Sequence, residues 1–347
     1  MATSSKTEIE YVEFGVPGDK VLVPRIGLGC MGLTSAYAAA NDEESVQVMR
    51  HAVDIGCSFW DTADVYGVGQ NERLLSQVLK DSRDKVFVCT KFGHEFEEPK
   101  TEGELFHKYI KGLNGSPEYI KKAADASLRR LGVDKIDLYY QHRVDPNVPI
   151  EETVGAMAEL VKEGKVRYLG LSECSAETLR RAYKVHPIAA VQYEYNAWSL
   201  DLETNGLLDA CRELGVTLVA YSPLGRGFLS GTLRKFEDLE ENDIRRTHPR
   251  FQRENFDNNL KLVDAFEKLA EKKGCTTSQL ALAWVLAQDK NLIVIPGTKR
   301  IKYLDSNVAA GDVKLNEDDL KEIRAVIDST PVVGHRYPEK LAKWLNN

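Results

Sequence analysis

The amino-acid sequence predicts an α/β fold, a (β/α)8 TIM barrel with an N-terminal β-hairpin and long loops at its C-terminal face. Two features of the 347-residue chain support this class. Short apolar runs alternate with longer helical patterns, which is typical of parallel strands joined by right-handed crossovers. Each apolar run is nearly continuous, as expected for a strand buried on both faces. An open doubly wound sheet is the alternative that the same alternation allows.

Eight apolar runs are predicted to be strands, a number that favours closure into a barrel. They span 25–30, 58–63, 85–91, 136–142, 166–173, 189–195, 216–223 and 291–298. The helical patterns between them span 41–56, 116–132, 149–164, 175–186 and 202–215, with two more around Phe266 and Trp284. Capping signals support the boundaries: Asn41 and Ser116 suit N-caps, Pro117 suits a first helical position, and Gly56 and Gly132 suit helix ends.

Alternating residues around Pro17-Gly18-Asp19 predict a β-hairpin before the first barrel strand, where it is expected to plug the barrel floor. Two segments exceed ordinary loop length, namely 224–255 and the C-terminal tail. Long loops in a compact domain are usually functional, so both are expected to border a ligand site. We expect a single domain over 1–347, with the barrel at 24–330 and the tail at 331–347.

Composition disfavours several functional classes. The formal net charge is −7, whereas a nucleic-acid or membrane-surface role requires a basic face. No apolar run approaches the length of a membrane span, and the first residues lack the apolar core of a secretory signal. The six cysteines form no metal-binding spacing. The sequence thus predicts a cytoplasmic protein with reduced thiols, no bound metal and no nucleic-acid or membrane partner.

The stretch GLGCMG at 27–32 has the G-x-G-x-x-G spelling of a Rossmann phosphate loop. That motif also requires a helix that opens on its last glycine and an acid about 20 residues later. Here the next helical pattern begins only near Asn41, Asp54 lies within that helix, and Asp61 ends the second strand. We therefore interpret 27–32 as the end of barrel strand one and a tight loop that approaches a cofactor or substrate.

Four side chains with acid–base or hydrogen-bonding chemistry follow three neighbouring strands. Asp61 and Tyr66 come after the second strand, Lys91 ends the third, and His142 ends the fourth. Catalytic groups of barrels sit at the C-terminal ends of strands. An Asp–Lys pair, a loop tyrosine and a core histidine can each be purely structural when taken alone. Their convergence at one rim favours a catalytic set.

The chemistry available to this set is proton donation to a carbonyl. Tyrosine has a reference pKa of about 10, and a nearby ammonium lowers that pKa. A buried ammonium needs a counter-charge, which Asp61 can supply. A neutral histidine can orient the carbonyl. None of the four residues can supply a hydride, so the sequence requires a cofactor for a reduction.

The chain resembles the aldo-keto reductase family, in the branch common in plants, fungi and bacteria. The motifs that carry this likeness are DTADVYG, TKFG, DLYYQHRVD, GKVRYLGLSE, VQYEYN, AYSPLGRGFLSG and IPGTKRIKYLDSN, in family order along nearly the whole chain. The resemblance implies a (β/α)8 barrel and NADPH bound across its mouth without a Rossmann domain. By motif, Tyr66 would be the general acid, Lys91 its pKa partner, Asp61 the partner of Lys91, and His142 the substrate-orienting residue.

The resemblance also implies cofactor contacts. The nicotinamide carboxamide would meet Ser172 and Gln192, although Glu173 stands where many relatives carry Asn. Tyr221 would lie under the ring, the loop 222–227 would embrace the pyrophosphate, and the helix start at 297–300 would face the 2′-phosphate. The full set of expected contacts is Ser172, Gln192, Tyr221, Ser222, Pro223, Leu224, Gly225, Arg226, Gly227, Gly297, Thr298, Lys299, Arg300 and Asn307, the last toward the adenine.

The function implied is NADPH-dependent reduction of aldehydes and ketones, with a small-molecule carbonyl as partner and the oligomeric state left open. An NADPH-sensing regulatory subunit is the alternative, because some relatives of this family associate with channels. A metal-dependent barrel hydrolase is disfavoured, because only His142 among the seven histidines ends a strand. The candidates for an apolar substrate wall, each also compatible with core packing, are Met31, Tyr37, Trp60, Trp198 and Phe228.

Overall fold

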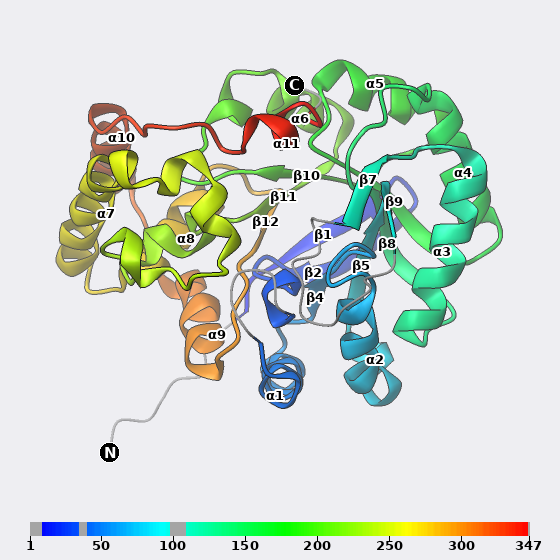
Figure 1. Ribbon diagram of the computed structural model, residues 1–347, viewed down its shortest axis with the longest axis horizontal. Coiled ribbons are helices and arrows are strands. Elements are labelled where there is room, and N and C mark those ends of the chain that lie inside the picture. The colour runs from blue at the N-terminus through cyan, green and yellow to red at the C-terminus, as the bar shows by residue number, and fades with distance from the viewer. Residues whose placement is uncertain (1–8, 35–39, 98–108, 346–347) are drawn as a thin grey trace.

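The computed structural model describes residues 9–34, 40–97 and 109–345. Within these residues eight parallel strands follow one another around a central barrel (Figure 1). They are β3 (Leu28–Gly29), β4 (Phe59–Asp61), β5 (Phe87–Phe92), β8 (Ile136–Gln141), β9 (Val166–Ser172), β10 (Ala190–Glu194), β11 (Thr217–Tyr221) and β12 (Leu292–Ile295). A parallel bridge between Ile26 and Val294 joins the first strand to the last. The predicted closed barrel is confirmed, and the open sheet is excluded.

The strand register brings the predicted site residues to one rim. Asp61 at the end of β4 pairs with Cys89 of β5, so Lys91 lies two residues further along the neighbouring strand. Lys91 in turn pairs with Tyr140 of β8, and His142 follows directly after that strand. Because parallel strands end at the same face of a barrel, three separate sequence motifs meet there.

The helices pack around the outside of the barrel (Figure 1). Both predicted N-caps are formed: the Asn41 side chain accepts from the amides of Glu43 and Glu44, and the Ser116 hydroxyl accepts from the Tyr119 amide. The predicted helices are α1 (Asp42–Asp54), α3 (Pro117–Leu131), α4 (Ile150–Lys162), α5 (Ala176–Val185), α6 (Leu207–Leu214), α7 (Arg253–Lys273) and α8 (Thr277–Ala287), and α9 (Ile301–Val308) follows the last strand.

Several elements were not among those predicted. Helix α2 (Gln70–Ser82) begins after Gly69, which has a left-handed φ of 81° and no capping side chain, so its start carries no N-cap signal. Helix α10 (Glu317–Ser329) does have a capping box, formed by Asn316 and Asp319. Also unpredicted are the antiparallel pair β6 (His94–Phe96) and β7 (Ile110–Leu113), the short helix α11 (Glu339–Ala342) in the tail, and several short 3-10 helices.

The predicted hairpin is formed by β1 (Tyr11–Val16) and β2 (Asp19–Pro24), and it closes the barrel floor. Phe14 is fully buried there, with its ring centroid 6.0, 5.1 and 5.5 Å from those of Phe59, Phe87 and Tyr168. These edge-to-face contacts join the hairpin to strands from both sides of the barrel. The floor is therefore a packed aromatic layer, and the opening lies at the opposite end.

All six cysteines are free thiols, and five of them are buried. No helix in the described ranges is long and apolar enough to cross a lipid bilayer.

Replacement of Phe14 by Ala is expected to lower the free energy of unfolding by about 3–5 kcal/mol, because it leaves a cavity in the aromatic floor. The measurement is urea denaturation followed by circular dichroism. Leu22→Ala on the same hairpin is the matched control: Leu22 is 67% exposed, so its truncation is expected to change stability by less than about 0.5 kcal/mol. Equal losses in both variants would contradict a plug that packs through Phe14.

Candidate active site

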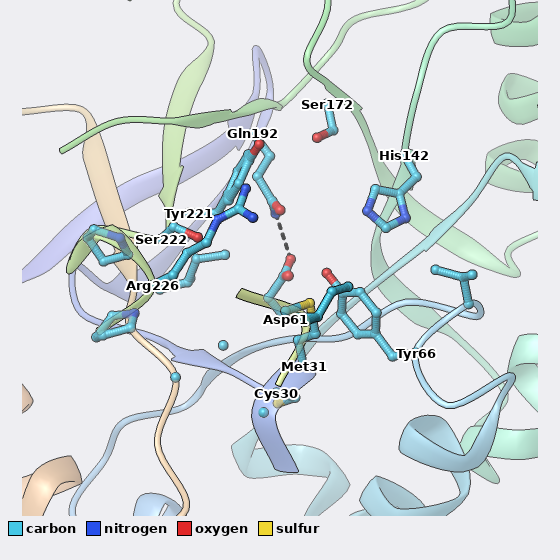
Figure 2. Close-up of a pocket in the computed structure, with 18 of the residues that line it drawn as sticks. Cys30, Met31, Asp61, Tyr66, His142, Ser172, Gln192, Tyr221, Ser222 and Arg226 are labelled. Carbon is cyan, nitrogen blue, oxygen red and sulfur yellow. Dashed lines mark hydrogen bonds between the residues drawn. The ribbon is translucent and has the colours of Figure 1, made fainter. Parts of the chain in front are cut away.

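A cavity of about 400 Å³ opens at the carboxyl end of the barrel strands (Figure 2). Of the four predicted catalytic residues, Asp61, Tyr66 and His142 line it, while Lys91 is fully buried directly behind. Gly29, Cys30, Met31 and Gly32 also line the cavity, so the last four residues of the GLGCMG stretch lie at its wall. The structure thus brings the three strand-end motifs into one site.

The centre of the site is a buried ion pair. The Lys91 ammonium donates to the Asp61 carboxylate, to the Thr62 carbonyl oxygen at 2.7 Å and toward the Tyr66 hydroxyl at 3.5 Å. Both charged side chains are buried, at 0% and 3% exposure. Burial lowers the pKa of Lys91, but the Asp61 carboxylate and the Tyr66 hydroxyl together outweigh burial, and the pKa is raised overall. Lys91 therefore stays an ammonium beneath the tyrosine.

Gln192 has an additional contact that sequence reasoning did not include. Its side-chain amide donates to the second Asp61 oxygen at 2.7 Å, the dashed line in Figure 2. Asp61 is thereby held from two sides, by Lys91 and by Gln192. Because each buried carboxylate oxygen has a donor, the Asp61 side chain is fixed in the orientation that serves Lys91.

The pKa of the Tyr66 hydroxyl differs from the sequence prediction. Burial raises the pKa of Tyr66, and although the Lys91 ammonium acts in the opposite direction, the net change is upward. We expected the nearby ammonium to give a net decrease of this pKa. The sequence does not show how deeply the phenol is buried, and burial reverses the direction. At neutral pH Tyr66 is therefore a protonated phenol, the form that can donate a proton.

His142 is neutral because of its surroundings. Burial, His94 and Arg143 lower the pKa of His142 well below its ordinary value. Burial and the Arg143 charge also lower the pKa of His94, to about 3. The His142 ring lies edge-on to Tyr66 and to His94, with centroids 5.8 and 4.8 Å apart. Its Nδ1 atom is buried and has no hydrogen-bond partner among the described residues. A neutral imidazole at this position can orient a polar ligand atom without adding charge.

The expected cofactor residues divide into two groups. Most line the cavity: Ser172, Gln192, Tyr221, Ser222, Pro223, Leu224, Arg226, Gly227, Gly297, Thr298 and Lys299. The structure does not bring Gly225, Arg300 or Asn307 to the wall. Asn307 is buried within α9, and Arg300 is exposed as the residue before that helix.

The loop 222–227 has unusual backbone geometry. Ser222 and Arg226 adopt left-handed conformations with φ of 49° and 59°, which are costly for residues with a side chain and cluster at functional sites. The amides of Gly225 and Gly227 donate to the carbonyl oxygens of Ser222 and Leu224, at 2.8 and 3.0 Å. Two of the backbone donors expected to embrace a pyrophosphate are therefore used within the loop.

Cations gather at the end of the cavity near the start of α9. Lys299 lines the wall of the cavity. Burial lowers its pKa, and the neighbouring Arg245 and Arg300 charges act in the same direction. The carboxylates of Glu240 and Asp243 act in the opposite direction. Arg245 comes from the long segment 224–255, which sequence reasoning expected to border a ligand site but could not place. Its guanidinium donates to the Arg226 carbonyl oxygen at 2.9 Å, joining this segment to the loop 222–227.

Of the residues predicted to form the substrate wall, some lie in the core and not at the cavity. Met31 lines the cavity, whereas Trp60, Trp198 and Phe228 are core residues; Trp198 and Phe228 pack on each other with ring centroids 4.1 Å apart. Tyr37 lies outside the described residues. The wall instead includes residues that sequence reasoning missed, namely Val65, His94, Ile110, Arg143, Tyr337, Leu341, Trp344 and Leu345. Arg143 directly follows His142 in QHRVD, and the last four belong to the predicted C-terminal tail.

The fold and the site together define a class: a TIM barrel whose mouth holds a tyrosine over a buried lysine–aspartate pair, beside a neutral histidine. The model of the aldo/keto reductase family matches residues 25–328. The chain therefore belongs to the aldo/keto reductase family, as its motifs predicted. It is an oxidoreductase of carbonyl and alcohol groups, and the metal-dependent hydrolase is not retained.

Curated relatives cover almost the whole chain. Aldo-keto reductase yakc of Schizosaccharomyces pombe, named for NADP(+), is 49% identical over 320 residues, covering 91% of this chain and 92% of its own. A probable aldo-keto reductase 1 of Glycine max is 46% identical over 338 residues, covering 96% and 93%. Among solved structures, a glycerol dehydrogenase from Gluconobacter oxydans has a TM-score of 0.81 at 28% identity, with 96% of both chains covered.

Replacement of Lys91 by Met is expected to destabilise the fold by about 3–5 kcal/mol, because it leaves Asp61 buried without a cation. Burial already raises the pKa of Asp61 although Lys91 opposes it, and removal of the cation raises the folded-state pKa further above the unfolded value near 4. Protonation then favours the folded state, so the stability deficit of the variant should shrink as the pH is lowered toward about 4. Urea denaturation at several pH values measures both effects.

Two further variants serve as controls for the ion pair. Lys165→Met removes a half-exposed ammonium that meets Asp125 and Glu163 at 2.9 and 3.0 Å, and it should cost no more than about 1 kcal/mol. Asp61→Asn combined with Lys91→Met should be more stable than Lys91→Met alone and should lose its pH dependence. Indistinguishable single and double variants would contradict a buried charge as the cause.

Proposed function

We propose that the protein reduces aldehydes and ketones to alcohols with NADPH, and that Tyr66 is the general acid. The observation that carries the proposal is the Tyr66 hydroxyl at the cavity wall, 3.5 Å from the buried Lys91 ammonium and beside the neutral His142. Family membership supplies the reaction class, and the S. pombe relative is named for NADP(+). A small-molecule carbonyl is the substrate that this site fits.

The residues of the cavity suit an NADP dinucleotide. Lys299 and Arg245 offer fixed cations next to the start of α9, where a dianionic 2′-phosphate is stabilised. Burial is the main cause of the lowered pKa of Lys299, and the carboxylates of Glu240 and Asp243 oppose the effect of the neighbouring Arg245 and Arg300. A bound phosphate would add a further anionic partner for this partly buried ammonium. Near the catalytic group, Ser172, Gln192 and Tyr221 offer polar and aromatic contacts for the nicotinamide. The bound cofactor supplies the hydride that no side chain can provide.

The chain's own residues then manage the proton. His142, neutral because it is buried, orients the carbonyl oxygen toward Tyr66. The Tyr66 phenol, whose pKa burial keeps above its ordinary value, holds the proton until the oxygen becomes negative and then donates it. The Lys91 ammonium stabilises the resulting tyrosinate, and Asp61 keeps Lys91 charged and in place. Each role follows from one contact in the site.

Tyr66→Phe removes the donated proton while keeping the ring. Turnover of NADPH with a panel of aromatic and aliphatic aldehydes should fall by about 10²–10⁴-fold, while the dissociation constant for NADPH, measured by fluorescence, stays within a few-fold. Tyr11→Phe on the exposed β1 strand is the matched control and should keep full turnover. Undiminished turnover by the Tyr66→Phe variant would contradict the proposed mechanism. Tight NADPH binding without turnover by the unmodified protein on any carbonyl would favour the regulatory-subunit alternative.

Cofactor choice provides an independent check. Changing Lys299 and Arg300 together to Ala should raise the dissociation constant for NADPH by about tenfold or more, since a charge-assisted contact is worth roughly 1.5–3 kcal/mol. NADH lacks the 2′-phosphate, so its affinity should change little. Lys302→Ala, an exposed position one residue into α9, is the control and should leave both affinities intact. Equal weakening for the two cofactors would show that the phosphate binds elsewhere.

A further inference from the structure

The C-terminal tail is tied to the barrel mouth before it reaches the cavity. Asn259 of α7 and Val333 exchange two hydrogen bonds, at 2.8 and 2.9 Å, and the Arg250 guanidinium donates to the Gly334 carbonyl oxygen at 3.2 Å. In Figure 1 the tail, drawn in red, runs from α10 across the molecule to α11. These contacts deliver Arg336 and Tyr337 to the rim beside β9, β10 and β11.

Arg336 forms a forked contact with Glu173. Its two terminal nitrogens donate to the two carboxylate oxygens at 3.1 and 3.0 Å, and the side chains are 7% and 0% exposed. A planar two-point contact of this kind is among the strongest that two side chains make. Because both groups are buried, neither charge is balanced by water, and each depends on its partner.

The Glu173 carboxylate lies against residues that wall the cavity. Glu173 follows Ser172 at the end of β9 with a left-handed φ of 51°, and its Oε1 atom also accepts from the Tyr221 hydroxyl at 2.8 Å and from the Glu194 amide at 3.1 Å. The Tyr221 hydroxyl meets that of Tyr337 at 2.9 Å. Ser172, Tyr221 and Tyr337 all line the cavity. A charge on Glu173 therefore changes the electrostatic potential at this wall of the cavity.

Arg336 contacts Glu173 directly, whereas the charges of Arg143 and Arg250 act on Glu173 and Glu194, respectively, from further away. The second buried carboxylate, Glu194, meets Arg226 at 3.4 Å and Arg336 at 3.6 Å. Asp201, which is largely exposed, adds a third carboxylate 3.4 Å from Arg336. Loss of Arg336 thus leaves a buried negative charge directly behind Tyr221. Many relatives in the aldo-keto reductase family carry a neutral Asn at the position of Glu173. In this chain the position therefore holds a negative charge that needs a cation nearby.

We propose that Arg336 is a positioning residue that sets the relative affinity of the site for NADP+ and NADPH by neutralising Glu173. The oxidised nicotinamide ring carries a positive charge and the reduced ring does not. An unbalanced carboxylate behind Tyr221 stabilises the oxidised ring selectively, so the Arg336–Glu173 contact removes a bias toward NADP+. The inference rests on the proposed function, which assigns the nicotinamide to Ser172 and Tyr221.

The test compares dissociation constants for NADP+ and NADPH, measured by fluorescence titration, in three variants. Arg336→Gln should shift the affinity ratio about tenfold toward NADP+, as expected for one unit charge near the ring at an effective dielectric constant of about 20. Glu173→Gln should shift it in the opposite direction, because it leaves the Arg336 cation. The double variant Glu173→Gln/Arg336→Gln should return the ratio to within about threefold of the starting value.

A merely structural role for the tail predicts a different pattern. Asn259→Ala loosens the tail at Val333 without changing a charge, and it should leave the ratio unmoved even if both affinities weaken. If Arg336→Gln does not fold, Glu173→Gln and the double variant still decide the matter. An unchanged ratio in Glu173→Gln or in a folded Arg336→Gln variant, with both cofactors bound by the unmodified protein, overturns this inference alone. Failure of the unmodified protein to bind either cofactor overturns the proposed function itself.

Discussion

A lysine ammonium buried at the mouth of the barrel requires a carboxylate partner, and the rest of the site is arranged around that requirement. Lys91 and Asp61 come from adjacent strands, so only the correct register of β4 and β5 lets them meet. Gln192 on a strand across the barrel holds the other face of Asp61. An error in any of the three strands would leave a buried charge unpaired, at a cost of several kcal/mol. The same pair therefore secures the architecture and supports the chemistry proposed for Tyr66.

A second ionic layer lies at the opposite side of the cavity, where the C-terminal tail meets strands β9 and β10. Arg336, Glu173, Glu194 and Arg226 are all buried or nearly so, and they join the tail to the loop 222–227. Tyr337 packs over the Arg226 guanidinium, with 4.5 Å between the charge centre and the ring centroid. The two layers differ in origin: the Lys91–Asp61 pair is internal to the barrel, whereas the second layer includes Arg336 of the tail. The proposed proton transfer and the proposed cofactor environment thus depend on different parts of the chain.

The strands were the most predictable elements, because each is an apolar run buried on both faces and its ends are set by turn residues. Helices with side-chain caps, such as α1 and α3, were also predictable, whereas α2 begins after a left-handed glycine that carries no N-cap signal. Large aromatic residues were poor guides to the substrate wall. Trp60, Trp198 and Phe228 fill the core, since a large apolar side chain gains more from complete burial than from lining a wet cavity.

By itself, the sequence determined the barrel, the family and the four residues at the strand ends, because strand periodicity and local motifs record which side chains share a rim. Tertiary structure alone decided the direction of the Tyr66 pKa, the role of Gln192 beside Asp61, and the meeting of Arg336 with Glu173 across 163 positions of chain. The physical reason is that burial and long-range charge pairing depend on everything that surrounds a group. A motif shows which residue stands at a position, but not how much water or opposite charge the folded chain leaves beside it.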